Sequence, residues 1–385
     1  MKYTFKSSLN LAALILVGGA IACTSTSQKP AAQTARPGEA CPIDTLYLST
    51  EKGDASRFRG DASTTRFVIL QEEDPWMFSE IRQVIDAFGK FFIVDKFEHR
   101  QVLAFDRNGK PVALYGKRGN GPGEYLFPWT VKVSADYVYV LDASKRKLNL
   151  YRHDGKFVRN YTVPFSCKGF TLLDNQRFLF QLDPSEESHH QLCITDSTLT
   201  PMSTLLPYPD HYVGGWGTDT PFQETPQGIY YYCSPADTIY HLDFQGRLIG
   251  KRLLQFANGP MDKLTKLDFI QAEESGKLDH GMHLLNNPYV GADGRCWMEV
   301  TNYTDPGTYI VTSYPQQGWY GAQKFGDPLS VYDVITPCAL SEQGEIISFL
   351  DQSIAEKCDD YTTLPDSLQR ALQDGERILV IHSPR

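Results

Sequence analysis

A short glycine-rich segment contains the first side chains that could bind a ligand. It runs from Gly116 to Gly123, holds Arg118, and continues into Glu124 and Tyr125. Glycines can cradle a phosphate, but the order Gly-x-x-x-x-Gly-Lys-Ser/Thr is absent, which argues against a nucleotide site. Gly and Pro also allow a chain to turn sharply, so we predict that the segment is a tight connection from the outer edge of one sheet to the innermost strand of the next. We predict that Arg118, Glu124 and Tyr125 lie near the mouth of a channel through the folded domain and contact a ligand there.

Trp216 is a second candidate for ligand binding. It follows Gly214 and Gly215 and precedes Gly217. Glycines around an aromatic side chain let the backbone approach another molecule closely, as a strand lining a binding site would require. A Trp wedged between two packed sheets is an equally good interpretation.

Four aspartates occupy equivalent places at the ends of apolar runs: Asp95, Asp142, Asp183 and Asp351. Recurrence indicates a structural role, such as accepting hydrogen bonds from backbone N–H groups. If several of them met on one axis, Ca²⁺ is the ion they would hold, because hard cations prefer several oxygen ligands. Otherwise the sequence predicts no metal site and no cofactor. It also lacks a Gly-x-Ser-x-Gly elbow, so it predicts no catalytic residue.

The N-terminus has the features of an export signal. Lys2 and Lys6 precede an apolar run that ends in Ala20-Ile21-Ala22-Cys23. Small residues before a cysteine are typical of bacterial lipoproteins, so we predict a signal peptide over 1–22 and acylation of Cys23. The alternative is an ordinary secretory signal cut near Ala22. Residues 23–41 are rich in Ser, Thr, Gln, Pro and Ala, which predicts a flexible tether from a membrane to the domain.

Composition excludes some partners and favours β structure. The 385 residues carry a formal net charge of −9 and no basic run, which argues against nucleic-acid binding. Aromatic residues make up 12% of the chain, and they favour strands. Among the cysteines after Cys23, Cys167 and Cys193 are the first pair to test for a disulfide.

The body of the chain repeats one pattern, in which a turn residue precedes a short apolar run that ends in a polar residue. The turn residues are 39 to 66 residues apart: Gly89, Asp136, Asn175, Gly228, Gly294 and Gly344. Uninterrupted apolar runs of this length are typical of strands buried on both faces. Repeats of about 45 residues with several short strands are typical of propeller blades.

We therefore predict that residues 42–385 form an all-β, six-bladed β-propeller. The last repeat lacks one strand, and Thr65–Leu70 is predicted to supply it and close the ring. Met261, Leu264 and Leu267 recur at helical spacing, which predicts a short helix over 260–274, inserted between blades four and five. A second helix is predicted over 365–373, before the final strand.

Residues Gly89 to Pro128 resemble an NHL-type repeat. In particular, Gly119-Asn120-Gly121-Pro122-Gly123-Glu124-Tyr125 is similar to the end of the first blade in six-bladed propeller lipoproteins of Bacteroidota (NHL/TolB-like propellers). The resemblance covers about 40 residues and implies the fold and an envelope location. It implies no particular chemistry, because this family is named by its fold.

These features predict a lipid-anchored protein of the cell envelope, at the outer membrane. Its expected function is non-catalytic binding of a ligand or an envelope protein at a channel mouth. The alternative is a metal-dependent hydrolase or lyase that works in the channel, which requires three or more carboxylate or His groups in one place. A third interpretation is a structural subunit of an envelope complex, which would expose a large apolar patch.

Overall fold

A computed structural model describes residues 41–48, 63–184, 189–208, 220–233, 236, 238–256, 283–291, 294–302, 307–314, 319–324, 329–335 and 337–383. The predicted signal peptide, Cys23, most of the tether and Trp216 lie outside these residues, as does the predicted helix over 260–274. None of the described helices has the length and hydropathy needed to span a bilayer.

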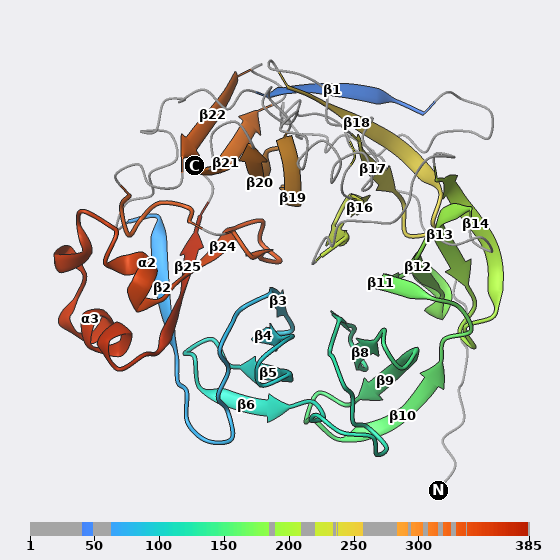
Figure 1. Cartoon of the computed structure of the whole chain (residues 1–385), viewed down its shortest axis with the longest axis horizontal. Helices are drawn as coiled ribbons and strands as arrows, with labels where there is room; N and C mark the ends of the chain where they lie inside the picture. The colour runs from blue at the N-terminus through green and yellow to red at the C-terminus, as the bar shows by residue number, and fades with distance from the viewer. Residues whose placement is uncertain are drawn as a thin grey trace, which may run out of the picture. The chain divides into compact units, whose positions relative to one another are not determined.

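The described strands form six sheets, each dominated by antiparallel pairing (Figure 1). Three sheets follow the chain without interruption. Sheet one contains β3 (Gln83–Ala87), β4 (Lys90–Asp95), β5 (Gln101–Phe105) and β6 (Pro111–Leu114). Sheet two contains β7 (Thr130–Val133), β8 (Val138–Asp142), β9 (Lys147–Tyr151) and β10 (Phe157–Thr162). Sheet three contains β11 (Cys167–Leu172), β12 (Phe178–Leu182), β13 (His190–Thr195) and β14 (Pro201–Pro207).

Sheet five also follows the chain without interruption, whereas sheets four and six each include one strand from the N-terminal region. Sheet four contains β15 (Phe222–Thr225), β16 (Gly228–Tyr231), β17 (Thr238–Leu242) and β18 (Leu248–Phe256), and β1 (Ile43–Leu48) pairs with β18 in parallel. Sheet five contains β19 (His283–Val290), β20 (Cys296–Asn302), β21 (Gly307–Tyr314) and β22 (Trp319–Lys324). Sheet six contains β23 (Ala339–Leu340), β24 (Ile346–Leu350), β25 (Arg377–His382) and β2 (Thr65–Leu70).

The predicted closing strand is confirmed. β2 pairs antiparallel with β25 along its whole length, from Thr65 opposite His382 to Leu70 opposite Arg377. The last sheet therefore takes its outermost strand from a segment that precedes sheet one in the chain. Such closure joins the two ends of the propeller through backbone hydrogen bonds.

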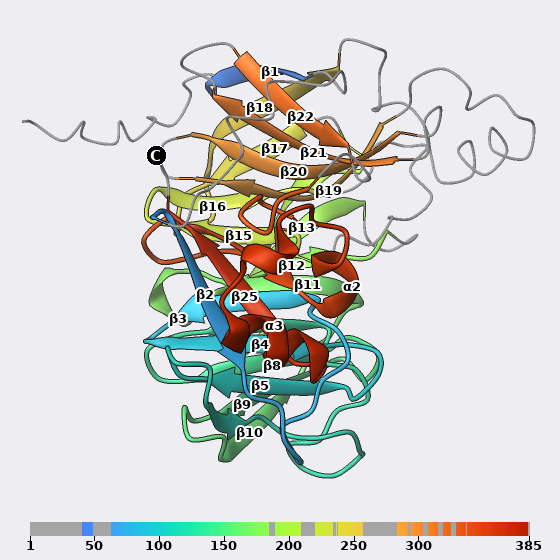
Figure 2. The same ribbon diagram turned by 90° about the vertical axis from the view of Figure 1, so that its left-hand side faces the viewer.

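Hydrophobic clusters connect neighbouring sheets in a cycle. The contact between sheets six and one includes Leu70, Leu379 and Phe91, all at most 1% exposed. Five further clusters join sheets one and two, two and three, three and four, four and five, and five and six. A single sheet of this kind cannot bury both faces, so each depends on its two neighbours for its core. This arrangement is an all-β propeller, seen from the side in Figure 2.

The burial of residues along each strand follows from this packing. β4 and β12 are buried almost throughout, because they lie inside their sheets with another sheet on each face. The predicted C-terminal helix is confirmed as α3 (Asp366–Gln373), which buries Leu368, Ala371 and Leu372. A shorter helix, α2 (Gln352–Ala355), and single 3-10 turns at Asp174–Gln176 and Tyr361–Thr363 complete the described helices.

Candidate functional site

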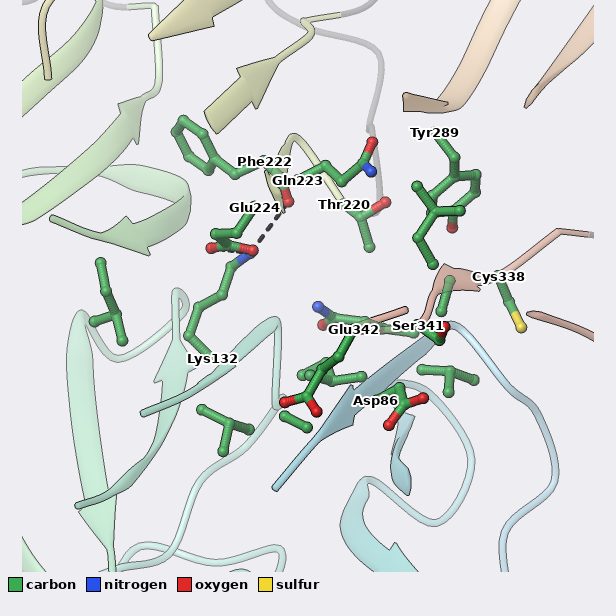
Figure 3. A pocket seen from close by; sticks show the side chains of 18 of the residues that line it. Asp86, Lys132, Thr220, Phe222, Gln223, Glu224, Tyr289, Cys338, Ser341 and Glu342 are labelled. Atoms are coloured by element: carbon green, nitrogen blue, oxygen red, sulfur yellow. Dashed lines mark hydrogen bonds and ion pairs between the residues drawn. The ribbon is translucent and has the colours of Figure 1, made fainter. Parts of the chain in front are cut away.

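The first strands of all six sheets surround one cavity of about 420 Å³. β3, β7, β11, β15, β19 and β23 each contribute residues to its lining. The labelled side chains in Figure 3 converge on this space from several sheets. Cavities of roughly 300–1,000 Å³ are the size that proteins use for small ligands. The cavity is therefore the candidate functional site.

The cavity opens at the end where each first strand turns into the second. Ser341 and Glu342 follow β23, Asp174 follows β11, and Phe244 lies in the turn between β17 and β18. In an antiparallel four-stranded sheet, the first and third turns lie at one end, and the connection to the next sheet leaves from the other end. The loops that join consecutive sheets therefore lie at the opposite face from this opening.

An ion pair crosses the cavity. The Lys132 ammonium on β7 lies 2.7 Å from both carboxylate oxygens of Glu224 on β15, and it donates to the Phe222 carbonyl at 3.1 Å. The Thr171 hydroxyl on β11 donates to the same carboxylate. Only 8% of the Lys132 side chain is exposed, against 38% for Glu224. Glu224 is thus the member of the pair that a ligand would meet.

Asp86 brings a second carboxylate to the cavity wall. Its side chain is almost fully buried, and its closest partner is the Arg107 guanidinium at 2.5 Å. Burial raises the pKa of Asp86, while Arg107 opposes this shift and the negative charges of Glu342 and Glu345 add to it. Glu342 is exposed and accepts a hydrogen bond from the Phe88 N–H at 3.2 Å. This side of the cavity carries more negative than positive charge.

Apolar and aromatic side chains form the rest of the wall. Val84, Leu173, Phe222 and Tyr289 are each less than 9% exposed, and Phe244 is half-buried. Such a surface can hold the carbon skeleton of a ligand while a few polar groups orient it. The cavity therefore combines an apolar wall with acidic groups.

Two glutamines hold neighbouring first strands together. Gln83 on β3 exchanges hydrogen bonds of 3.3 and 3.4 Å with the backbone of Val131 on β7. Gln223 on β15 makes the same exchange with Val290 on β19, at 2.9 and 2.6 Å. Each side-chain amide imitates a backbone amide, so these residues fix the spacing of the cavity wall.

The glycine-rich segment forms the connection from sheet one to sheet two, as predicted. Glu124 accepts a hydrogen bond from the Gly121 N–H at 2.8 Å and forms an ion pair with Lys117 at 3.6 Å, and these contacts lower its pKa. Tyr125 is 0% exposed and donates to the Tyr115 carbonyl at 2.8 Å. Arg118 is exposed. None of these three predicted ligand-binding residues lines the cavity, so a role for them in binding stays a prediction.

The recurring aspartates accept hydrogen bonds at strand ends. Asp95 accepts from the backbone N–H groups of Ser79, Phe97 and Glu98 at 2.8, 3.2 and 3.1 Å. Asp142 accepts from the Leu126 N–H at 2.6 Å, and Asp351 from the Ile354 N–H at 2.8 Å. The predicted structural role is confirmed for these three residues. Asp183 forms side-chain contacts, with the Ser166 hydroxyl at 2.8 Å and the Lys168 ammonium at 3.4 Å.

Within the described part of the chain, no three His, Cys, Asp or Glu side chains come together as a metal site would require. Each aspartate of the recurring set serves its own strand end, so calcium binding by that set has no support from the geometry. Cys167 and Cys193 are both free, and the disulfide suggested for them is absent.

Residues of the cavity were missed by the sequence analysis, although a signal for them exists. The first strands interrupt an apolar pattern with a charged or amide residue, as in Gln83-Val-Ile-Asp86, Thr130-Val-Lys132 and Phe222-Gln-Glu224. Polar residues in strands this short and this buried point to a shared interior site. Which of them face one another depends on the order of the sheets around the axis.

Comparisons with other proteins show one matching family and several similar structures. A family model described as "Domain of unknown function (DUF4934)" matches residues 49–322. A presumed exported protein, BF0058 from Bacteroides fragilis NCTC 9343, has a similar structure, with a TM-score of 0.70, 17% identity, and coverage of 89% of this chain and 99% of its own.

A second structure, a member of the duf4221 family from Bacteroides vulgatus, matches with a TM-score of 0.52 and 11% identity over 82% of this chain and 95% of its own. A streptogramin B lyase structure matches with a TM-score of 0.44, which indicates nothing about activity. No curated protein matches the sequence significantly. The similarity to the exported protein from Bacteroides fragilis supports the propeller fold.

Proposed function

Because the chain belongs to the DUF4934 family, whose description assigns no activity, we propose its function from the cavity: it is a non-catalytic propeller that binds a ligand or a segment of an envelope protein in the channel. The observation that carries this proposal is one cavity of about 420 Å³ lined by the first strands of all six sheets. A rigid scaffold with a partly apolar pocket suits recognition, and the same fold supports many functions.

A cavity-filling substitution tests this proposal. Val133 lines the cavity and is half-buried, so Val133→Phe would add a ring to the space that a ligand needs. Val112 is 42% exposed and lies outside the cavity, so Val112→Phe is the matched control. We expect small-molecule probes that raise the melting temperature of the native protein to lose that effect with Val133→Phe and keep it with Val112→Phe. Equal responses of both variants would contradict binding in the cavity.

The proposal includes six blades. Six described sheets each place one strand at the cavity, and six hydrophobic clusters join them in a cycle. An electron-density map of the domain would test this number directly. A map in which one of the six sheets lay outside the ring would contradict it.

The proposal also places the protein in the cell envelope, anchored at the outer membrane through Cys23. The support comes from the signal-like segment before Cys23 and the Ser/Thr-rich stretch after it. Radiolabelled palmitate should be incorporated into the native protein in cells, and Cys23→Ser should abolish the labelling. Persistent labelling of Cys23→Ser would contradict the anchor. The matched variant Cys41→Ser should remain labelled.

Arg118 and Glu124 lie on the connection between sheets one and two, at the face opposite the cavity opening. A partner protein docking there is a separate element of the proposal, and Arg118 is the exposed residue that would contact it. Trp216 lies outside the described residues, and its proposed contact with a ligand rests on its glycine neighbours alone.

A further inference from the structure

We infer that the channel cavity binds an organic cation, through an ammonium group on a short carbon chain. This inference rests on the proposed function, because it names the chemical class of the ligand for the same site.

The cavity lining has an excess of acidic groups. Its described residues include four carboxylates, Asp86, Asp174, Glu224 and Glu342, and one amine, Lys132. No arginine or histidine is among these lining residues. An interior space with low-dielectric walls concentrates the field of such groups, so a positive ligand is attracted and a negative one is repelled.

The one cation of the lining is already neutralised. Lys132 is almost buried and lies 2.7 Å from both oxygens of Glu224. A ligand carboxylate would have to displace Glu224 from this pair, which would leave the glutamate without its cation. The pair therefore offers little to an anionic ligand, whereas the more exposed Glu224 can accept a further hydrogen bond from an ammonium group.

Two of the other carboxylates have no cationic partner in the part of the chain that the structure describes. Among the described residues, no ion pair involves Glu342 or Asp174, and both are exposed. Asp174 accepts a hydrogen bond from the neutral Gln245 amide. Asp86 pairs with Arg107, but the negative charges of Glu342 and Glu345 also act on its carboxylate. The Oδ2 atom of Asp86 is buried without a hydrogen bond to any described residue. A bound ammonium would relieve this repulsion.

The apolar wall determines the remainder of the ligand. Val84, Leu173, Phe222 and Tyr289 are buried at the cavity surface. Methylene groups pack on such a surface, and aromatic faces also attract cations. A bare metal ion would not use this wall. The site therefore suits an alkylammonium group, whether it belongs to a free amine or to a lysine side chain.

Three probes of equal length separate charge from shape: 1,5-diaminopentane, 1,5-pentanediol and glutarate. We expect calorimetry on the native protein to show the diamine binding at least tenfold more tightly than the diol, and no binding of glutarate. Binding of the diol or glutarate as tight as that of the diamine would overturn the inference. Binding of none of the three would also overturn it.

Two substitutions with the same charge change complete the test. Glu342→Gln, in the exposed rim of the cavity, should weaken diamine binding by threefold to tenfold, and Glu98→Gln, exposed and outside the cavity, should leave it unchanged. An unchanged affinity in Glu342→Gln would overturn the inference.

A comparison of diaminopentane with Nα-acetyl-lysine methylamide then distinguishes a free amine from a protein side chain. Failure of the proposed function is a different result, in which Val133→Phe leaves the binding of every probe unaltered.

Discussion

Lys132 and Glu224 meet although the strands that carry them belong to sheets that are not neighbours. Lys132 lies on β7 of sheet two, Glu224 on β15 of sheet four, and Thr171 of the intervening sheet three donates to the same carboxylate. The Glu224 carboxylate thus connects three sheets at the cavity. The pair should contribute to stability as well as to the charge of the site.

Glu224→Gln should destabilise the protein, because it leaves the buried Lys132 ammonium without its counter-charge. Removing one partner of a buried pair costs about 3–5 kcal/mol, and the partial exposure of Glu224 lowers the expected loss to about 1–3 kcal/mol. Urea unfolding of Glu224→Gln, Lys132→Met and the double variant should show that the double variant loses less than the sum of the two. Strict additivity would show that the pair is not coupled. The exposed pair Lys156–Asp154, at 3.0 Å, is the control, and its neutralisation should leave the free energy of unfolding almost unchanged.

Asp95→Ala should be strongly destabilising, because several backbone N–H groups at one strand end lose their acceptor together. The Asp95 side chain is fully buried, and it accepts from Ser79, Phe97 and Glu98. The expected loss is about 3 kcal/mol in the free energy of unfolding, and Asp95→Asn, which keeps one oxygen, should lose about half of that. Urea unfolding measures both. The exposed Asp359 provides the control, and equal losses in Asp359→Ala and Asp95→Ala would refute the role assigned to Asp95.

Gly109→Ala should loosen the closure of the ring. Gly109 has a φ of +78°, and a Cβ atom there would lie 1.7 Å from the Ile69 carbonyl oxygen of β2. The closing strand would have to move, at a cost of about 3 kcal/mol, and amide exchange along β2 should become faster.

Gly89 is the control that separates the steric clash at Gly109 from the energetic cost of a positive φ in a residue other than glycine. It has a φ of +72° with no atom within 4 Å of a Cβ position. Gly89→Ala should therefore cost about 1 kcal/mol, from backbone conformation alone. Similar losses in the two variants would argue against a clash at β2.

Low pH should destabilise sheet six, because His382 on β25 becomes protonated. This residue is 6% exposed, it contacts the Ser348 hydroxyl at 2.9 Å, and burial lowers its pKa from 6.5 to about 4. A depressed histidine pKa means that the folded state favours the neutral ring. The stability that the neutral His382 ring provides is therefore complete above pH 6.5 and is lost as the pH falls from 6.5 towards 4. At pH 4 the free energy of unfolding should be lower by about 3 kcal/mol.

The measurement is the free energy of unfolding between pH 7.5 and 4.5. His382→Gln should show a flatter dependence on pH than the native protein, since one titrating group is removed. The exposed His189 gives the matched control, and His189→Gln should keep the native dependence. A native-like slope in His382→Gln would show that another group causes the loss.

Much of the fold could be predicted from the sequence because its signals are local. The apolar runs of β4, β8 and β24 are buried as their composition indicates, and the helix over 366–373 places its leucines on one buried face. The aspartates at strand ends also recur at fixed positions, so their role follows from the repeat. The pairing of β2 with β25 was predictable because the last repeat lacked a strand.

The site could not be predicted in the same way. Ligand binding was predicted for Arg118, Glu124 and Tyr125 because they lie within or next to a glycine-rich segment. In the structure that segment connects sheets one and two, and Tyr125 is buried in the core.

The sequence by itself determined the repeating strands, the closing strand and the helix. The repeating strands and the helix depend on periodicity within a short window, and the closing strand follows from a last repeat that lacks one strand. Only the tertiary structure decided that Lys132, Glu224, Asp86 and Glu342 share one cavity. Their positions span more than 250 residues, and their approach depends on the cyclic order of the sheets, which no local pattern encodes.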